Sequence, residues 1–231
     1  YWRVTTSDSY LTVTSAATRS STPAPTPTSN PQVGFGQGWM STPVFEVDTS
    51  TGNLSFASTD ASVTGVLQDL TITRSYNSLG ATTVNAFGKG WTSNWESRAS
   101  QNSTGVTVIN ADGSLDFYGL NPDGQYASAY GSGNTMTLNP EAGVTWRVTE
   151  PDGTTRDYGS DGKFKAVRNL VGWSITSTWP NSATQVIADT ASGRTLTLAY
   201  STPAGATIQH VSSVTTQSVT GLGVLEWRYY Y

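Results

Sequence analysis

The chain has 231 residues, which is long enough for one large β domain or two smaller ones. Only 12% of the residues are charged and the net charge is −4, so the sequence has no basic footprint for binding nucleic acid. It contains no cysteine and one histidine, which excludes disulfides and thiol nucleophiles and argues against a zinc or copper site. No apolar run approaches the ~20 residues of a membrane-spanning helix.

The first nineteen residues predict a β-hairpin. Residues 1–6 and 10–14 alternate polar and apolar side chains around a turn at Ser7-Asp8-Ser9. We interpret residues 1–19 as the last strands of an upstream β-sandwich module of the fibronectin III or immunoglobulin type. Because the chain starts and stops within strand patterns, we expect it to be a fragment of a longer protein whose export signals lie outside it.

Residues 20–33 predict an extended linker. Proline occurs at every second position from Pro23 to Pro27, and Pro31 follows. Proline fixes φ and removes the backbone donor, so a segment of this composition forms neither helix nor sheet and acts as a semi-rigid tether.

The segment 34–140 is predicted to open a second β domain. Short strands over 43–48 and 52–58 flank a turn-rich loop, and residues 70–76 alternate as a further strand. A polar loop from Leu79 to Ala86 leads to the sequence Phe87-Gly88-Lys89-Gly90-Trp91. We interpret this cluster as a packed β corner, in which the two glycines allow close backbone approach beside the aromatic rings.

Residues 141–231 continue with β-hairpins, and no segment of the chain has the periodicity and caps of a long helix. Asp-Gly dipeptides supply the positive φ that tight turns need. The predicted hairpins join 106–110 to 114–118, 145–149 to 154–158, 154–158 to 163–167 and 185–188 to 194–200. An alternating strand is also predicted over 206–211. The fold class is therefore all-β, built from successive antiparallel hairpins with essentially no helix.

Three of these features together resemble the Rhs/YD-repeat family of bacterial polymorphic-toxin and wall-associated proteins. They are the sequence from Thr51-Gly52-Asn53-Leu54 to Thr59-Asp60, the pair of motifs TRSYNS and FGKGW, and the hairpin PDGTTRDYG with DGKF. The resemblance spans residues 43–231. The hairpin repeats are less specific than the two motifs at their observed separation.

The resemblance implies a non-catalytic shell. In that family, β-hairpins wind into a hollow wall around a toxin domain at the C-terminal end of the polypeptide. The expected partners are therefore the rest of the chain's own shell and an enclosed toxin domain, with a cell-wall or glycan ligand assigned to the upstream module. The implied location is secreted or at the bacterial cell surface. The Asp-Pro-x-Gly motif that ends the shell is absent here, so no self-cleavage or toxicity is assigned.

No catalytic, cofactor-binding or metal-binding residue is predicted. The residues that carry the resemblance are expected to be structural, and Arg74, Tyr76, Trp91 and Trp95 are expected to be buried, with Asp60 or Asp69 as the ion-pair partner of Arg74. The full structural signature is Arg74, Tyr76, Asn77, Phe87, Gly88, Gly90, Trp91, Trp95, Asp152, Gly153, Tyr158, Asp161 and Gly162.

Other readings of the chemistry are weaker. His210, the only histidine, is expected to face solvent or a polar contact, because no Gly-x-Ser-x-Gly elbow supports a triad. The Asp152–Gly162 segment does not have the ligand spacing of an EF-hand. The main alternative function is a carbohydrate-binding or adhesin-type β-sandwich, which predicts an exposed row of tryptophans such as Trp91 and Trp173. A glycosidase would require two converging carboxylates.

Overall fold

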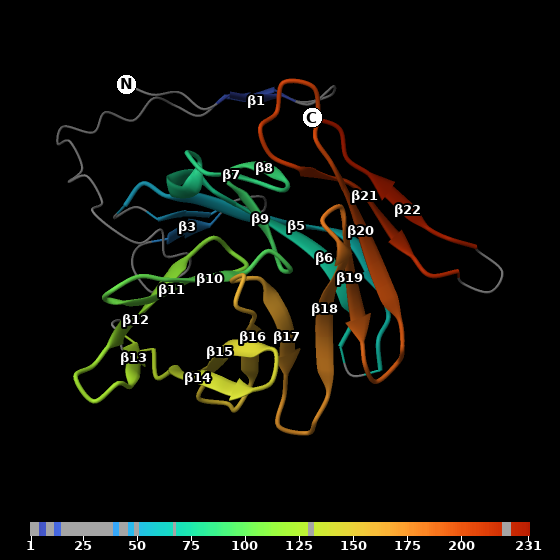
Figure 1. Cartoon of the computed structure of the whole chain (residues 1–231). Helices are drawn as coiled ribbons and strands as arrows, with labels where there is room; N and C mark the ends of the chain where they lie inside the picture. Colours follow the sequence, from blue (N-terminus) through green and yellow to red (C-terminus); the bar gives the residue numbers. More distant parts are fainter. Residues whose placement is uncertain are drawn as a thin grey trace, which may run out of the picture.

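The computed structural model describes a β-rich molecule (Figure 1). The described residues are 5–7, 12–14, 39–41, 46–48, 51–66, 68–128, 132–218 and 223–231. Within them the regular structure is β-strand, apart from the single 3-10 turn η1 (Ser78–Gly80). The all-β prediction is confirmed. None of the helices among the described residues is long and apolar enough to cross a membrane.

Part of the predicted N-terminal hairpin is described. β1 (Thr5–Ser7) and β2 (Thr12–Thr14) pair antiparallel, with Thr5 opposite Thr14. The rest of residues 1–19, including the turn, and the linker predicted at 20–33 lie outside the described residues. The assignment of β1 and β2 to an upstream sandwich therefore stays a prediction.

A five-stranded antiparallel sheet contains the opening motifs. β6 (Leu70–Asn77) lies between β5 and β9, and its alternation buries Leu70 and Ile72 completely. A bulge between Thr59 and Ala61 interrupts the register of β5 against β6. The sheet order is β3 (Trp39–Ser41), β4 (Glu46–Asp48), β5 (Leu54–Val63), β6 and β9 (Trp91–Ser93). A separate two-stranded ribbon, β7 (Val84–Asn85) with β8 (Gly88–Lys89), occupies the loop between β6 and β9.

The remaining strands form one long meander. Among the described residues it has thirteen strands, and each pairs antiparallel with its neighbours in the chain. The boundary predicted between residues 140 and 141 falls inside one of these strands, so the sheet runs through it. The strands are β10 (Arg98–Gln101), β11 (Gly105–Ile109), β12 (Leu115–Leu120), β13 (Tyr126–Ser128), β14 (Thr135–Glu141), β15 (Val144–Thr149), β16 (Thr155–Tyr158), β17 (Phe164–Arg168), β18 (Ser174–Asn181), β19 (Thr184–Asp189), β20 (Thr195–Ser201), β21 (His210–Thr216) and β22 (Glu226–Arg228).

The predicted hairpins of the meander are confirmed, with one shifted boundary. β11 pairs with β12, β15 with β16, β16 with β17 and β19 with β20. The strand predicted over 206–211 begins only at His210. The reason is local: Pro203 and Gly205, with φ of +81°, make a turn closed by a hydrogen bond from the Ala206 N–H to the Pro203 carbonyl.

The meander curls back onto its own start. Its first strand, β10, is hydrogen-bonded on one side to β11, and on the other side it meets the turn between β16 and β17. The Ala99 N–H donates to the Gly162 carbonyl over 2.9 Å. Gly162 has φ of +77°, and a Cβ placed there would lie 2.3 Å from the Ala99 carbonyl oxygen. Glycine is therefore required at this seam for two independent reasons.

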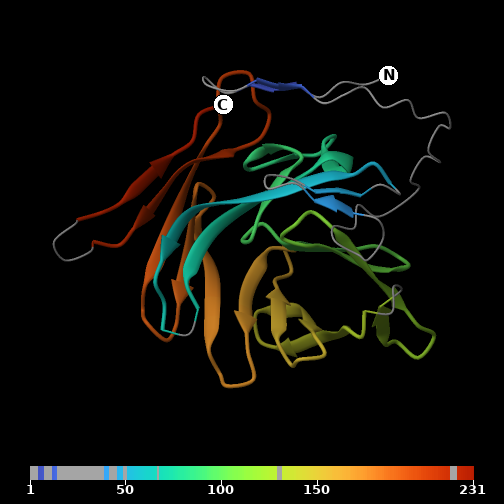
Figure 2. The ribbon, with the colours of Figure 1, turned by 180° about the vertical axis from the view of Figure 1, so that it is seen from behind.

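One hydrophobic core joins the two large sheets. Ala61, Leu70 and Ile72 of the five-stranded sheet belong to the same buried cluster as Ile187 and Leu196 of the meander. Figure 2 shows β5 and β6 running alongside β18 to β21. Gln185 strengthens this contact, because its Nε2 donates to the Trp95 carbonyl (3.3 Å). The chain is thus a curved wall of hairpins built against its own opening sheet.

Candidate functional site

Arg74 lies at the centre of the opening motif. It is on β6, and its guanidinium binds Asp60 of β5 through two hydrogen bonds, Nε to Oδ2 (2.5 Å) and Nη2 to Oδ1 (2.9 Å). This is the fork geometry in which arginine holds a carboxylate most firmly. The hydrogen bond to Asp60 raises the pKa of Arg74 above its usual value. Asp60 was one of the two partners predicted for Arg74.

Three aromatic rings surround the Arg74 guanidinium. Its Cζ lies 4.9 Å from the centroid of Trp91, 5.5 Å from Tyr229 and 5.9 Å from Phe87. The Tyr229 hydroxyl also donates to Asp60 Oδ2 over 2.9 Å. Burial and this bond to Asp60 raise the pKa of Tyr229. We call Asp60, Arg74, Phe87, Trp91 and Tyr229 the Arg74 cage; it joins β5 and β6 to the segment that follows β22.

A second aromatic group, from β5 and β6, packs against the cage. The Phe56 ring meets Trp91 edge-on at 5.1 Å, and Tyr76 lies 5.5 Å from both of them. Gly90, with φ of +72°, leaves space for this packing, because a Cβ there would lie 2.9 Å from the Tyr76 ring. The Asn77 side chain accepts a hydrogen bond from the Leu79 N–H and caps η1. Gly88 has φ of +107° in the turn beside Phe87.

The burial predicted for the motif is only partly correct. Trp95 is 6% exposed and donates its Nε1 to the Thr71 carbonyl (2.7 Å), as expected for a buried anchor. Arg74, Tyr76 and Trp91 are half-buried instead of buried. Trp91 contacts both the Arg74 guanidinium (4.9 Å) and the Tyr76 ring (5.5 Å).

The hairpin residues of the signature lie apart from the cage. Asp152 and Asp161 each accept a backbone N–H two residues on, from Thr154 and Lys163, and stabilise their turns. The bond from Thr154 lowers the pKa of Asp152. Tyr158 is fully buried and its hydroxyl is 2.8 Å from Ser97 Oγ. Gly153 has φ of +83°. These residues serve in turns and in the core, and the structure does not gather them into one site.

The sequence analysis did not single out two residues of this region, Tyr229 and Glu96. Tyr229 had no local signal, because it sits among three consecutive tyrosines at the end of a strand pattern. Glu96 was the only acid in the motif; its Oε1 accepts the Ala86 N–H (2.8 Å), and its Oε2 is buried without a hydrogen bond among the described residues. Its position directly after Trp95 in a short loop was the available hint.

His210 was predicted to face solvent or a polar contact, and it does not face solvent. It is 7% exposed and its ring stacks on Tyr231, with centroids 4.5 Å apart. Its Nδ1 makes no hydrogen bond among the described residues, and no carboxylate forms an ion pair with it. The arrangement of a Ser-His-Asp triad is therefore not present in the described part of the chain.

The described carboxylates are engaged in structural contacts. Asp157 is fully buried between Arg147 and Arg168, and both arginines also bind Glu141 (2.9 and 3.0 Å). Within the described residues no group of three or more His, Cys, Asp or Glu side chains could hold a metal ion. Asp157 and Glu141 thus form an ion-pair network with the two arginines.

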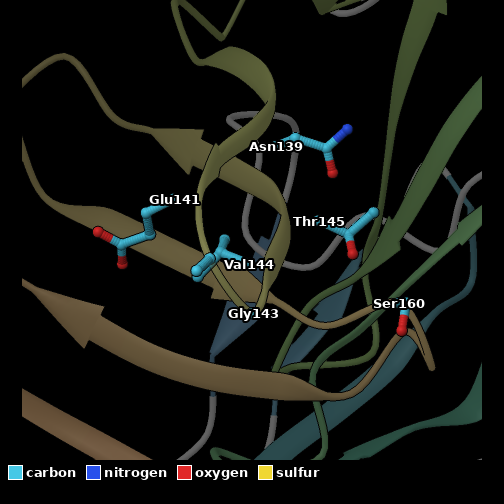
Figure 3. A pocket seen from close by; sticks show the side chains of 7 residues that line it. Asn139, Glu141, Gly143, Val144, Thr145 and Ser160 are labelled. Atoms are coloured by element: carbon cyan, nitrogen blue, oxygen red, sulfur yellow. The ribbon is translucent and has the colours of Figure 1, made fainter.

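An open hollow beside this network is lined by neutral polar groups and by Glu141. It lies between the β14–β15 hairpin and the β16–β17 turn, and Asn139, Thr145 and Ser160 contribute its polar side chains (Figure 3). Glu141, which also borders it, points away from Asn139 in Figure 3 and is bound by the two arginines. The hollow offers hydrogen-bonding groups, and its acid, Glu141, is held by Arg147 and Arg168.

The tryptophans with described side chains form no exposed row. Trp173 is 7% exposed and donates its Nε1 to Asp189 (2.9 Å), and Trp91 is half-buried in the cage. The others are buried or half-buried as well: Trp95, Trp146, Trp179 and Trp227. A planar glycan-binding platform of the kind predicted by the alternative function is thus absent from these side chains.

One family model matches the chain. It is the domain of unknown function DUF6531, and it covers residues 46–118. The matched segment contains most of the five-stranded sheet, four of the five cage residues and the first strands of the meander. No curated protein matches the chain.

Proposed function

We propose that this chain is a non-catalytic scaffold, the opening wall of an Rhs/YD-repeat shell that encloses a C-terminal toxin domain and helps to deliver it. The proposal includes a secreted or cell-surface location in a bacterium. Its partners are the remainder of the shell and the enclosed domain. The cell-wall or glycan contact is assigned to the upstream module.

The observation that carries the proposal is the strand order. From β10 to β22 every strand pairs with its neighbours in the chain, so the wall lengthens by one hairpin at a time without a crossover. Each added hairpin covers the open backbone edge of the one before it. The seam at Ala99 and Gly162 and the Arg74 cage support a closed wall, because both tie segments that are distant in the chain.

The chemistry of the described side chains also supports a scaffold. Buried polar groups such as Asp157, Asp189 and Tyr158 are used to join neighbouring strands and turns. The DUF6531 match includes the motifs TRSYNS and FGKGW, on which the resemblance to Rhs/YD-repeat proteins rests.

The proposal is tested with the complete natural polypeptide. We expect its C-terminal domain to resist proteinase K while the shell is folded, and to be digested when urea unfolds the shell. The control is the same C-terminal domain produced alone, which should be digested at once. Equal digestion rates in the two forms would refute enclosure. Glycan-array binding that Trp91→Ala abolishes with the fold intact would instead favour the carbohydrate-binding module.

A further inference from the structure

The turn of the β7–β8 ribbon and the end of the meander meet at the backbone of Ala86. Its N–H donates to Glu96 Oε1 (2.8 Å), and its carbonyl accepts both the Val211 N–H (2.9 Å) and the Tyr231 hydroxyl (3.1 Å). The Tyr231 hydroxyl is also 2.9 Å from the Val211 carbonyl. We call Ala86, Glu96, Val211 and Tyr231 the Ala86 junction. It links residues more than a hundred positions apart in the chain.

A charged Glu96 side chain would destabilise this junction. Its Oε2 is buried and has no hydrogen bond among the described residues, although the residue as a whole is half-buried. A carboxylate in this position loses hydration without gaining a matching partner. Burial is the main cause that raises the pKa of Glu96 to about 7; the Ala86 N–H, Ser93 and Arg98 act in the opposite direction.

The other charged and titratable groups near Glu96 do not compensate for the hydration that a charged Glu96 carboxylate loses. Arg98, on the same segment, is exposed and donates its Nη2 to Asn85 (3.3 Å). From the meander, Tyr200 of β20 approaches Glu96, and its hydroxyl donates to Gln185 Oε1 (2.6 Å).

The C-terminal side adds aromatic groups and no bonded cation. Burial, followed by the charge of Glu96, raises the pKa of Tyr231 to about 12, and the His210 ring packs against it at a tilt. Arg74 and Asp60 act on Tyr231 from the cage and are paired with each other. No lysine or arginine among the described residues forms an ion pair with Glu96.

We propose that the Ala86 junction is a pH-sensitive latch, which holds the β7–β8 turn against β21 while Glu96 is neutral and loosens when Glu96 ionises. The neutral acid keeps the hydrogen bond from Ala86 without burying a charge. The latch is a property of this chain's own two sheets and does not depend on the proposed shell.

The direction of the pH dependence follows from linkage. The carboxyl binds its proton more tightly in the closed junction, with a pKa of about 7 against the ordinary 4.5. The stabilisation is therefore complete below about pH 4.5 and is lost as the pH rises through 7. Between pH 5 and pH 8.5 the equilibrium constant for closing the junction should fall roughly 70-fold.

Hydrogen exchange of two amides tests the latch. The Ala86 and Val211 N–H groups both close the junction, so their protection factors, corrected for the intrinsic pH dependence of exchange, should fall tens of fold from pH 5 to pH 8.5. In Glu96→Gln the fall should be less than about threefold. Because His210 is retained in this variant, the comparison isolates Glu96.

A matched control and a second readout complete the experiment. Glu226→Gln changes an exposed glutamate and should behave as the wild type. An equal fall in Glu96→Gln and wild type would overturn the proposal. If Glu96→Gln does not fold, the test is the titration of the ¹³C-labelled Glu96 carboxyl in the wild-type chain. An apparent pKa near 7 supports the latch, and a value near 4.5 refutes it.

Discussion

At the scale of single residues, glycine is used in two different ways in this wall. At Gly172 the backbone turns with φ of +85° and open space lies around the position of a Cβ. At Gly162 a similar φ is combined with close contact to the Ala99 carbonyl. The first glycine is needed for its dihedral alone, and the second is needed for its dihedral and for its size.

This difference leads to a prediction for matched alanine substitutions. Gly172→Ala should lower the free energy of unfolding by about 1 kcal/mol, because alanine is less stable than glycine in the left-handed conformation. Gly162→Ala should cost about 3 kcal/mol or more, because the seam between β10 and the β16–β17 turn must also open. Urea denaturation of the two variants measures both values. Equal losses would mean that the seam does not constrain the fold.

At the scale of elements, the strands differ in how many partners they have. β20 pairs with β19 and β21, and its Leu196 and Leu198 are fully buried. Among the described strands β22 pairs only with β21, and its three residues are exposed or half-buried. An edge strand with few buried side chains opens at lower free energy than a central one.

We therefore expect a gradient of hydrogen exchange across the meander. Amides of β20 should exchange at least about 100-fold more slowly than those of β22 at the same pH and temperature. β6 is the internal control, because it is central in the other sheet and buries Leu70 and Ile72. Exchange mass spectrometry of peptides covering these strands gives the rates. Protection of β22 equal to that of β20 would show that its outer edge is covered in solution.

At the scale of the whole molecule, the Arg74 cage joins the opening sheet to the segment after β22. Arg74 and Tyr229 both contact Asp60, and the Tyr229 ring also meets Phe87 edge-on at 5.2 Å. Consecutive hairpins alone would leave the opening sheet independent of the end of the meander. The cage instead makes the stability of the opening sheet depend on residues far along the chain.

A double-mutant cycle measures this dependence. Arg74→Met should cost about 2–3 kcal/mol, because it leaves Asp60 without its ion-pair partner at a site that keeps some solvent contact. Its coupling energy with Tyr229→Leu should be about 0.5–2 kcal/mol. A control cycle pairs Arg74→Met with Met136→Ala in β14, which lies in a separate part of the molecule (Figure 1), and should be additive. Additivity in the Arg74–Tyr229 cycle would contradict the closure.

Local sequence patterns were enough to predict the fold class, the hairpins and most of their turns. Alternating strands and Asp-Gly turns are local signals, since a period of two and a positive φ depend on neighbouring residues only. For the same reason the sequence indicated a packed corner at Arg74, Phe87 and Trp91. Tertiary contacts, by contrast, place Tyr229 in the cage, close the seam at Gly162, and bury His210 and the Oε2 atom of Glu96. These features depend on contacts between segments tens to hundreds of residues apart, which no local pattern specifies.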